Sequence, residues 1–541
     1  MKLKKFAFIG INAAILAAAL LLLVSAGGSD RGSAQGGQTG RKSISVTVYD
    51  RSDVPAAEGT IENNRWTRWI NENSPVNVTF VAVSRSAPAE KLNVLFASGT
   101  APDLVFEYSP TIKTPLYNQG MLMPLDDAVE KYSTVYKAFL AKNPGIRKAG
   151  LKPDGKMYEL GRTNNATTQR TIYVRQDWLD KLNLKAPDTI EEMYQVAKAF
   201  AERDPDGNGL KDTYGIAVNA TLQEVYQVAY LINHVLVNGD YVHNWAQLSA
   251  YYDFVKRLYD EGIIDRDYLS DSNGTKASQD FLNGKIGIYP SDMSGLNLQM
   301  YTTLKQNVPG VKIVLIPYPK TQFNRVNPSM SNPVQMTAVV NAACKDPESV
   351  MKYVDFISDS KAYMTLQWGI EGVHYRMVNG MPTRIQEKAT EISYGTGDFL
   401  MLVPQTIKDP VTSRTMGFNL SVPLERELFD LRKSAYRNYD YSLPLASITH
   451  TEHLPQLPAE LEIINANLNM REFFDRAVVS GTRYTVEMAL RDARAAWERG
   501  GGNRIDDWFL NWYRTNRNTA FLYPDIYEIM KSQNLINFWA D

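Results

Sequence analysis

Three segments near the start of the chain alternate apolar and polar residues in the way that half-buried strands do. They are ISVTVYD (44–50), VNVTFVAV (76–83) and the more apolar DLVFEY (103–108). Between them, NNRWTRWINEN (63–73) and EKLNVLFASG (90–99) have the spacing of helices. Strands and helices in this order predict a parallel sheet covered by helices, so we expect an α/β fold.

The carboxyl ends of these predicted strands carry polar and aromatic residues. They are Tyr49, Asp50, Arg51, Ser84, Arg85, Glu107 and Tyr108. Because open α/β sheets bind their ligands beyond the carboxyl ends of the strands, we expect these side chains along the edge of a ligand-binding cleft.

A second folded region follows residue 165. The segment TIYVRQDWLDKLNL (171–184) predicts a strand that runs into a short helix, and PDTIEEMYQVAKAFAER (187–203) predicts a longer one. At the start of the longer helix, Thr189 and Glu192 have the spacing of a capping box. The helix leads directly into the acidic sequence DPDGNGLKDTYG (204–215).

This acidic loop matches most of an EF-hand-type calcium loop, which supplies oxygens from alternate positions and a glycine at the sixth. The predicted metal ligands are Asp204, Asp206, Asn208, Leu210 through its carbonyl, and Asp212. Gly215 replaces the usual final glutamate, and YGIAV predicts a strand after it, so a complete EF-hand is excluded. We expect a structural calcium ion. The alternative is a solvated turn, which Asp, Asn and Gly also form without a metal.

Length and charge limit the classes of function. A chain of 541 residues with 44% hydrophobic residues has enough material for more than one core. The chain carries 58 Lys plus Arg and 59 Asp plus Glu, a formal net charge of -1. No overall basic field is available to hold a nucleic acid, so nucleic acid is excluded as an expected partner.

The N-terminus has the pattern of an export signal. Three lysines within residues 2–5 precede an apolar run (6–24) and small residues at 24–26, which predicts a signal peptide over 1–26. Because the apolar run is almost long enough to span a bilayer, an uncleaved anchor stays open as an alternative. Residues 27–42 are rich in Gly, Ser and Gln and predict a flexible tether. We expect the protein in the periplasm or on the outer face of the cytoplasmic membrane.

The sequence YVRQDWLDKLNLKAPDTIEEMYQVAKAFAERDPDGNGLKDTYG (173–215) closely resembles family 1 of the extracellular solute-binding proteins. These are the sugar- and oligosaccharide-binding subunits of ABC importers, and the likeness is greatest to their long branch with a calcium loop. The segments FASGTAPDLVF, QGMLMPLDD, FLNGKIGIYPSD and GIEGVHYRMVNG occur in the order found in that branch.

The resemblance implies a two-lobe periplasmic-binding-protein fold of type II-like topology, with a ligand cleft between lobes and a hinge. We expect chain crossings near 163–171 and 317–333. The expected organisation is lobe 1 (43–165), lobe 2 with the calcium loop (166–325), a return to lobe 1 (326–390), and a helical part shared between lobes (391–541). The implied partners are a carbohydrate and the permease subunits of an ABC transporter, and we expect a monomer.

Carbohydrate sites pair flat aromatic rings with carboxylates, amides and arginines. On this basis, the predicted ligand-binding residues are Glu107, Tyr108, Arg175, Trp178, Tyr289, Asp292, Trp368, Glu371 and Tyr375. Each aromatic residue in this set has an alternative role in a hydrophobic core.

Two other classes of function were weighed against a binding protein. Glu107 and Glu371 are a conceivable acid and base pair of a secreted glycoside hydrolase, but no established catalytic motif follows a strand, so we expect no enzyme. A surface sugar sensor or adhesin stays open as well, because its sequence would look the same.

Overall fold

The computed structural model describes residues 40–163, 168–228, 233–378, 381–392, 394, 396–400 and 418–532. The predicted signal peptide and almost all of the predicted tether lie outside these residues. Within the described ranges, no helix is long and apolar enough to cross a membrane.

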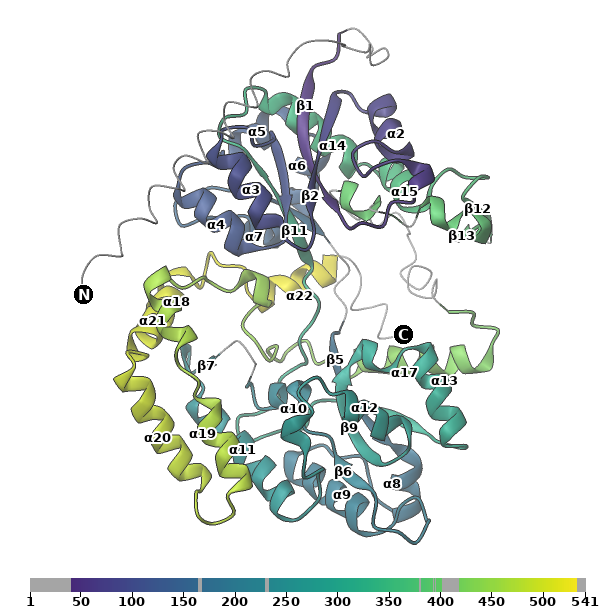
Figure 1. The fold of residues 1–541 in the computed structure, drawn as a ribbon, viewed down its shortest axis with the longest axis vertical. Helices are drawn as coiled ribbons and strands as arrows, with labels where there is room; N and C mark the ends of the chain where they lie inside the picture. The colour runs from purple at the N-terminus through teal and green to yellow at the C-terminus, as the bar shows by residue number, and fades with distance from the viewer. Residues whose placement is uncertain are drawn as a thin grey trace, which may run out of the picture. The chain divides into compact units, whose positions relative to one another are not determined.

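The first sheet contains the three strands predicted from the N-terminal alternation, β1 (Ser43–Asp50), β2 (Asn77–Ser84) and β3 (Leu104–Glu107). Two later strands, β4 (Glu159–Thr163) and β11 (Val334–Val340), complete it in the order β2-β1-β3-β11-β4. Figure 1 labels β1, β2 and β11 of this sheet. β1 runs parallel to β2 and β3, whereas β11 is antiparallel to β3 and β4. The predicted parallel core of the sheet is confirmed.

Helices cover this sheet and share one hydrophobic core with it. The core includes Val46 of β1, Val105 of β3, Ala338 of β11 and the helical Tyr353, each at most 1% exposed. Burying such side chains contributes about 1.5–3 kcal/mol each for the larger ones. The helices of this lobe are α2 (Arg65–Asn73), α3 (Pro88–Ala97), α4 (Pro110–Asn118), α5 (Asp126–Tyr132), α6 (Val135–Lys142), α7 (Pro144–Ala149), α14 (Pro347–Ser358) and α15 (Ser360–Trp368).

The second sheet has the order β10-β5-β9-β6. Its strands are β5 (Arg170–Arg175), β6 (Tyr214–Ile216), β9 (Ile286–Asp292) and β10 (Ile313–Ile316). A separate hairpin is formed by β7 (His234–Val237) and β8 (Asp240–His243). The helices of this lobe are α8 (Gln176–Leu182), α9 (Ile190–Glu202), α10 (Ala220–Val225), α11 (Trp245–Asp260), α12 (Thr275–Leu282) and α13 (Leu298–Asn307).

Local sequence signals explain where α9 begins and ends. The Thr189 side chain accepts a hydrogen bond from the Glu192 backbone N–H, and the Glu192 side chain accepts one in return from the Thr189 backbone. This confirms the predicted capping box. On the inner face, Met193, Ala197 and Phe200 are fully buried, so the helix is held to the sheet by its apolar stripe.

The C-terminal part of the chain is helical and contributes to the cores of both lobes (Figure 1). Helices α19 and α20 pack with α11 in a core that also includes α9. Helix α17 packs with the second sheet, and α22 packs with residues 146 and 334 of the first lobe. The helices are α17 (Pro423–Arg437), α18 (Ala459–Ala466), α19 (Arg471–Val479), α20 (Val486–Arg499), α21 (Asn503–Asn516) and α22 (Tyr523–Ser532).

Two connections carry the chain between the sheets. One lies between the end of β4 at Thr163 and the start of β5 at Arg170, and the other lies between β10 and β11, from 317 to 333. A small two-stranded sheet, β12 (Tyr375–Val378) with β13 (Met381–Arg384), follows α15.

Candidate ligand-binding site

Glu107 and Tyr108 lie at the carboxyl edge of the first sheet, where β3 ends. The buried Glu107 carboxylate accepts hydrogen bonds from the Tyr49 hydroxyl (2.7 Å) and from the backbone N–H of Ser109 (2.7 Å). Burial, together with the adjacent Glu107 charge, raises the pKa of Tyr49 well above its ordinary value, so the hydroxyl remains a donor. Glu107 therefore orders the start of α4. Tyr108 is the more exposed residue of the pair.

Tyr108 belongs to a charged group that the sequence did not reveal as a unit. Its hydroxyl lies 3.2 Å from Asp398, whose carboxylate also pairs with Arg51 at 2.7 Å. Arg162 of β4 approaches Asp398 to 4.0 Å, yet its Nη1 atom is buried and has no hydrogen-bond partner among the described residues. Burial lowers the pKa of Arg162. A buried donor without an acceptor is costly, so this atom is suited to an oxygen supplied by a ligand.

A third arginine completes this edge. The Arg85 guanidinium lies 4.4 Å from the centre of the Tyr108 ring and 5.2 Å from that of Tyr49. The two tyrosine rings are themselves 5.5 Å apart. Arg51, Arg85 and Arg162 thus lie around Tyr108 together with two carboxylates, those of Asp398 and Glu107, so the arginines outnumber the carboxylates by one.

A cavity of about 570 Å³ begins at Tyr108. Its aromatic lining comes from Tyr117 of α4, from Trp508 and Trp512 of α21, and from Phe521. The two tryptophans are half-buried and stand four residues apart, so they lie on one face of their helix. A cavity of this size with several flat rings suits a ligand that has extended apolar faces.

The same cavity is lined by four basic side chains and two acidic ones. They are Lys113, Arg147, Lys148, Lys152, Glu159 and Glu452. Arg147 and Lys148 also pair with Asp126 and Asp525. Lys113 and Lys152 share the buried carboxylate of Glu159. Among the lining residues themselves, basic side chains outnumber acidic ones four to two, and the carboxylates paired with Arg147 and Lys148 lie outside the lining.

Trp368, Glu371 and Tyr375 come together at the start of the β12–β13 pair. The Trp368 and Tyr375 rings meet edge to face at 6.3 Å, and both side chains are only 6% exposed. The Trp368 indole N–H is buried without a hydrogen-bond partner among the described residues. Glu371 is exposed on the adjoining turn. These three residues do not line the cavity that contains Tyr108.

Arg175 and Trp178 form a packed pair at the end of β5. Arg175 donates to both carboxylate oxygens of Asp177 (2.9 and 2.6 Å) and to the carbonyl of Gly284 (3.3 Å). Its guanidinium lies 4.4 Å from the centre of the Trp178 ring, and that ring packs edge-on against Phe200. Both residues are at most 2% exposed, so their contacts stabilise the second lobe.

Tyr289 and Asp292 lie on β9 but differ in surroundings. Tyr289 is buried and stacks on Phe281 at 4.6 Å. Asp292 is exposed and stands opposite Arg170 in the β5–β9 register, whereas Arg175 is at the other end of β5. Arg175 and Asp292 therefore lie toward opposite ends of β5, and Tyr289 lies between them, opposite Tyr173.

Hydrogen bonds link the predicted side-chain donors of the acidic loop to one another. Asp204, at a left-handed φ of 46°, accepts hydrogen bonds from the backbone N–H groups of Gly207, Asn208 and Gly209. The Asn208 side-chain amide lies between the carboxylates of Asp206 (2.9 Å) and Asp212 (3.2 Å). Burial, and then the neighbouring carboxylates, raise the pKa of Asp206. Oxygen donors that repel one another fit a hard cation such as Ca²⁺.

Several residues of the cavity, and of the charged group around Tyr108 next to it, were not predicted from the sequence. The spacing of Trp508 and Trp512 fits the apolar stripe of a core helix as well as it fits a binding surface. Arg162 lies inside a strand, where no pattern marks it as a site residue. Asp398 comes from a short 3₁₀ segment, Thr396–Phe399, far along the chain. The one sequence signal that pointed to this charged group was the predicted position of Arg51 and Arg85 at the carboxyl ends of the strands.

The chain belongs to the bacterial extracellular solute-binding protein family, since a model of that family matches residues 58–364. This confirms the family inferred from residues 173–215. Among curated proteins, the chain is similar to the polygalacturonan/rhamnogalacturonan-binding protein YtcQ of Bacillus subtilis (strain 168), with 26% identity over 455 residues that cover 79% of this chain and 85% of the relative.

Solved structures of two-lobe solute-binding proteins share the fold. One is an ABC-transporter-associated protein of Bifidobacterium longum infantis described as binding HMO, with a TM-score of 0.64, 17% identity, and coverage of 89% of this chain and 100% of the other. Another is the alginate-binding protein AlgQ2 without calcium ion, with a TM-score of 0.56, 20% identity, and coverage of 88% and 99%. At these identities the likeness shows the two-lobe α/β fold, as predicted.

Proposed function

We propose that the protein captures an oligosaccharide that carries carboxylate groups and delivers it to the permease of an ABC importer. The observation that carries this proposal is the cavity of about 570 Å³. Its wall contains Tyr108, Trp508 and Trp512, and four of its six charged side chains are basic.

The aromatic residues account for the carbohydrate. A sugar ring presents CH groups on its faces, and these pack on flat side chains, while its hydroxyls bond to polar groups at the ring edges. Trp508 and Trp512, one helical turn apart, offer platforms to more than one ring. This spacing favours an oligosaccharide over a single sugar.

The basic residues on the cavity wall and the arginines next to Tyr108 account for the carboxylates. Arginine binds a carboxylate through two parallel hydrogen bonds, and Arg162, outside the cavity lining, has a buried Nη1 without a hydrogen-bond partner in the described part of the chain. Arg51 and Arg85 flank the same tyrosine. The names of two similar proteins, one binding polygalacturonan or rhamnogalacturonan and one binding alginate, agree with an acidic ligand.

The family supports the remaining parts of the proposal. An extracellular solute-binding protein works outside the cytoplasmic membrane, which agrees with the export signal predicted over 1–26. Its relatives bind solutes without a described reaction, and Glu107 is engaged by Tyr49 and Ser109, so we propose transport and not hydrolysis. We also propose that the acidic loop holds a structural Ca²⁺ through Asp204, Asp206, Asn208, the Leu210 carbonyl and Asp212.

Calorimetric titration of the chain from Ser43 onward with an oligogalacturonide and with a neutral malto-oligosaccharide of equal length tests the function. We expect saturable binding of the acidic sugar, weakened by added salt because charges meet in the complex. Chromatography of the recovered mixtures then compares the sugars before and after. Preference for the neutral sugar would remove the acidic specificity, and cleavage products would replace transport with hydrolysis.

A further inference from the structure

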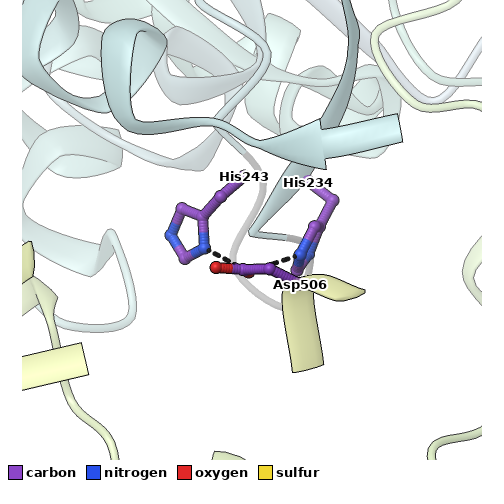
Figure 2. A group of neighbouring side chains, drawn as sticks. All are labelled: His234, His243 and Asp506. Atoms are coloured by element: carbon purple, nitrogen blue, oxygen red, sulfur yellow. Dashed lines mark hydrogen bonds and ion pairs between the residues drawn. The ribbon is translucent and has the colours of Figure 1, made fainter. Parts of the chain in front are cut away.

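Two histidines and an aspartate meet at the β7–β8 hairpin, and none of the three lines the cavity that contains Tyr108. His234 begins β7 and His243 ends β8, and the two are directly paired in the antiparallel register. Asp506 reaches them from the first turn of α21 (Figure 2). The group therefore joins two parts of the chain separated by more than 250 residues.

The distances match those between ligands of one metal ion. His234 Nε2 lies 2.9 Å and His243 Nδ1 lies 3.0 Å from the same oxygen, Oδ1 of Asp506. Zinc binds imidazole nitrogen and carboxylate oxygen at about 2.0–2.2 Å, so neighbouring ligand atoms around a tetrahedral ion are roughly 3–3.5 Å apart. A few tenths of an ångström of opening would admit the ion, and Figure 2 shows both rings directed at the carboxylate.

The surroundings hold the three side chains in this orientation. The His243 ring stacks on Trp245 at 3.9 Å with an angle of 8° between planes, and the His234 ring packs on Phe509 at 4.4 Å. The second oxygen of Asp506 accepts a hydrogen bond from the Trp497 indole N–H (2.8 Å). Fixed rings and a hydrogen-bonded carboxylate are what a metal ligand set requires of its neighbours.

The site also has an approach for an ion. Both histidine side chains are at most 5% exposed, but Asp506 is 26% exposed. His234 lines a second cavity of about 570 Å³, which is bordered mainly by residues 320–326 and 440–448. An ion can therefore reach the group without unfolding of the hairpin.

We propose that His234, His243 and Asp506 bind one divalent metal ion, and that among the common metal ions this is Zn²⁺. Two imidazoles and one carboxylate suit zinc, whereas the acidic loop at 204–212 offers only oxygens and suits calcium. The zinc ion fastens the β7–β8 hairpin to α21 and leaves one tetrahedral position for water or a small ligand.

Titration of zinc into the chain from Ser43 onward, stripped with EDTA and then held in excess Ca²⁺ to fill the acidic loop, tests the site. We expect one zinc per chain and a rise in melting temperature. The variants H243Q and D506N should each weaken zinc binding ~100-fold or more, since even loss of a partner outside the ligand set costs 10- to 100-fold.

The matched control is H374Q. His374 also faces a carboxylate, that of Glu391 at 3.2 Å, but in the described residues no second histidine joins it. H374Q should bind zinc as the unaltered chain does.

Co²⁺ added to the unaltered chain provides a readout that needs no variant, because a tetrahedral site gives intense visible absorption and an octahedral one does not. Three results would overturn the proposal: absence of stoichiometric zinc binding, octahedral Co²⁺, or equal losses of zinc affinity in H243Q and H374Q. The three side chains would then be a hydrogen-bonded link between the β7–β8 hairpin and α21.

Discussion

The ammonium group of Lys113 lies 2.7 Å from the carboxylate of Glu159, and these side chains are only 5% and 6% exposed. Lys152 contacts the other oxygen of the same carboxylate, and the Thr337 hydroxyl contacts the first. Burial alone would raise the pKa of Glu159, but the two ammonium groups outweigh it and hold that pKa far below its ordinary value. The first lobe thus carries a buried ion pair on the wall of the proposed ligand cavity.

Replacing Glu159 by Gln should destabilise the protein by about 3 kcal/mol or more, because removal of one partner leaves buried charge without compensation. Urea unfolding measures the change. The control is Glu130→Gln, since Glu130 is exposed and pairs with the exposed Lys137, and its loss should cost less than ~1 kcal/mol. Equal losses in the two variants would contradict the buried pairing.

Stability should fall on acidification because of His453. Burial, reinforced by His450 and Lys113, lowers the pKa of His453 from 6.5 to about 3. Its Nε2 atom lies 3.0 Å from the Asn332 side-chain oxygen. Between those two pH values the unfolded chain binds more protons than the folded one, so the free energy of unfolding decreases as pH falls through that window.

Unfolding experiments at several pH values between 6.5 and 4.5 check this. His453→Gln should reduce the slope of the free energy of unfolding against pH by the equivalent of up to one proton, and Glu130→Gln is the control for a substitution at an exposed position. An unchanged slope in His453→Gln would show that other histidines carry the effect.

Much of the fold could be predicted because its signals are local. Alternation defined β1 and β2, and the Thr189–Glu192 capping box defined the start of α9. The expectation that β1, β2 and β3 end along one edge placed Arg51, Arg85 and Tyr108 near one another, since adjacent parallel strands end together.

The remaining site residues depend on contacts between distant segments. Arg162 meets Asp398, and Tyr108 shares a cavity with Trp512, across separations of more than two hundred residues that no local pattern encodes. The burial of individual side chains also could not be predicted from the sequence: Arg175 and Trp178 have the composition of a sugar site but stack on each other inside a core.

Calcium should stabilise the protein through the acidic loop. Asp212→Asn removes one of the two carboxylates that face the Asn208 amide, so it should lower affinity for Ca²⁺ and reduce the rise in melting temperature that Ca²⁺ produces. At a hundredfold excess over Kd, binding to the folded state alone is worth about 2.7 kcal/mol. Asp267→Asn, an exposed aspartate in another turn, is the control. A melting temperature that does not respond to Ca²⁺ would favour a solvated turn.

Trp512 and Trp368 allow the position of the carbohydrate site to be tested directly. Trp512 is half-buried on the cavity wall, so Trp512→Ala should weaken binding of an oligogalacturonide by about 1–3 kcal/mol through loss of a stacking surface. Trp368 belongs to the predicted cluster with Glu371 and Tyr375, outside that cavity, so Trp368→Ala should change affinity less. Trp69→Ala, which removes a ring packed on Phe356, controls for general loss of aromatic contacts. Calorimetry of the three variants, each checked for an intact thermal transition, decides between the surfaces: a loss confined to Trp368→Ala would move the site to the β12–β13 pair.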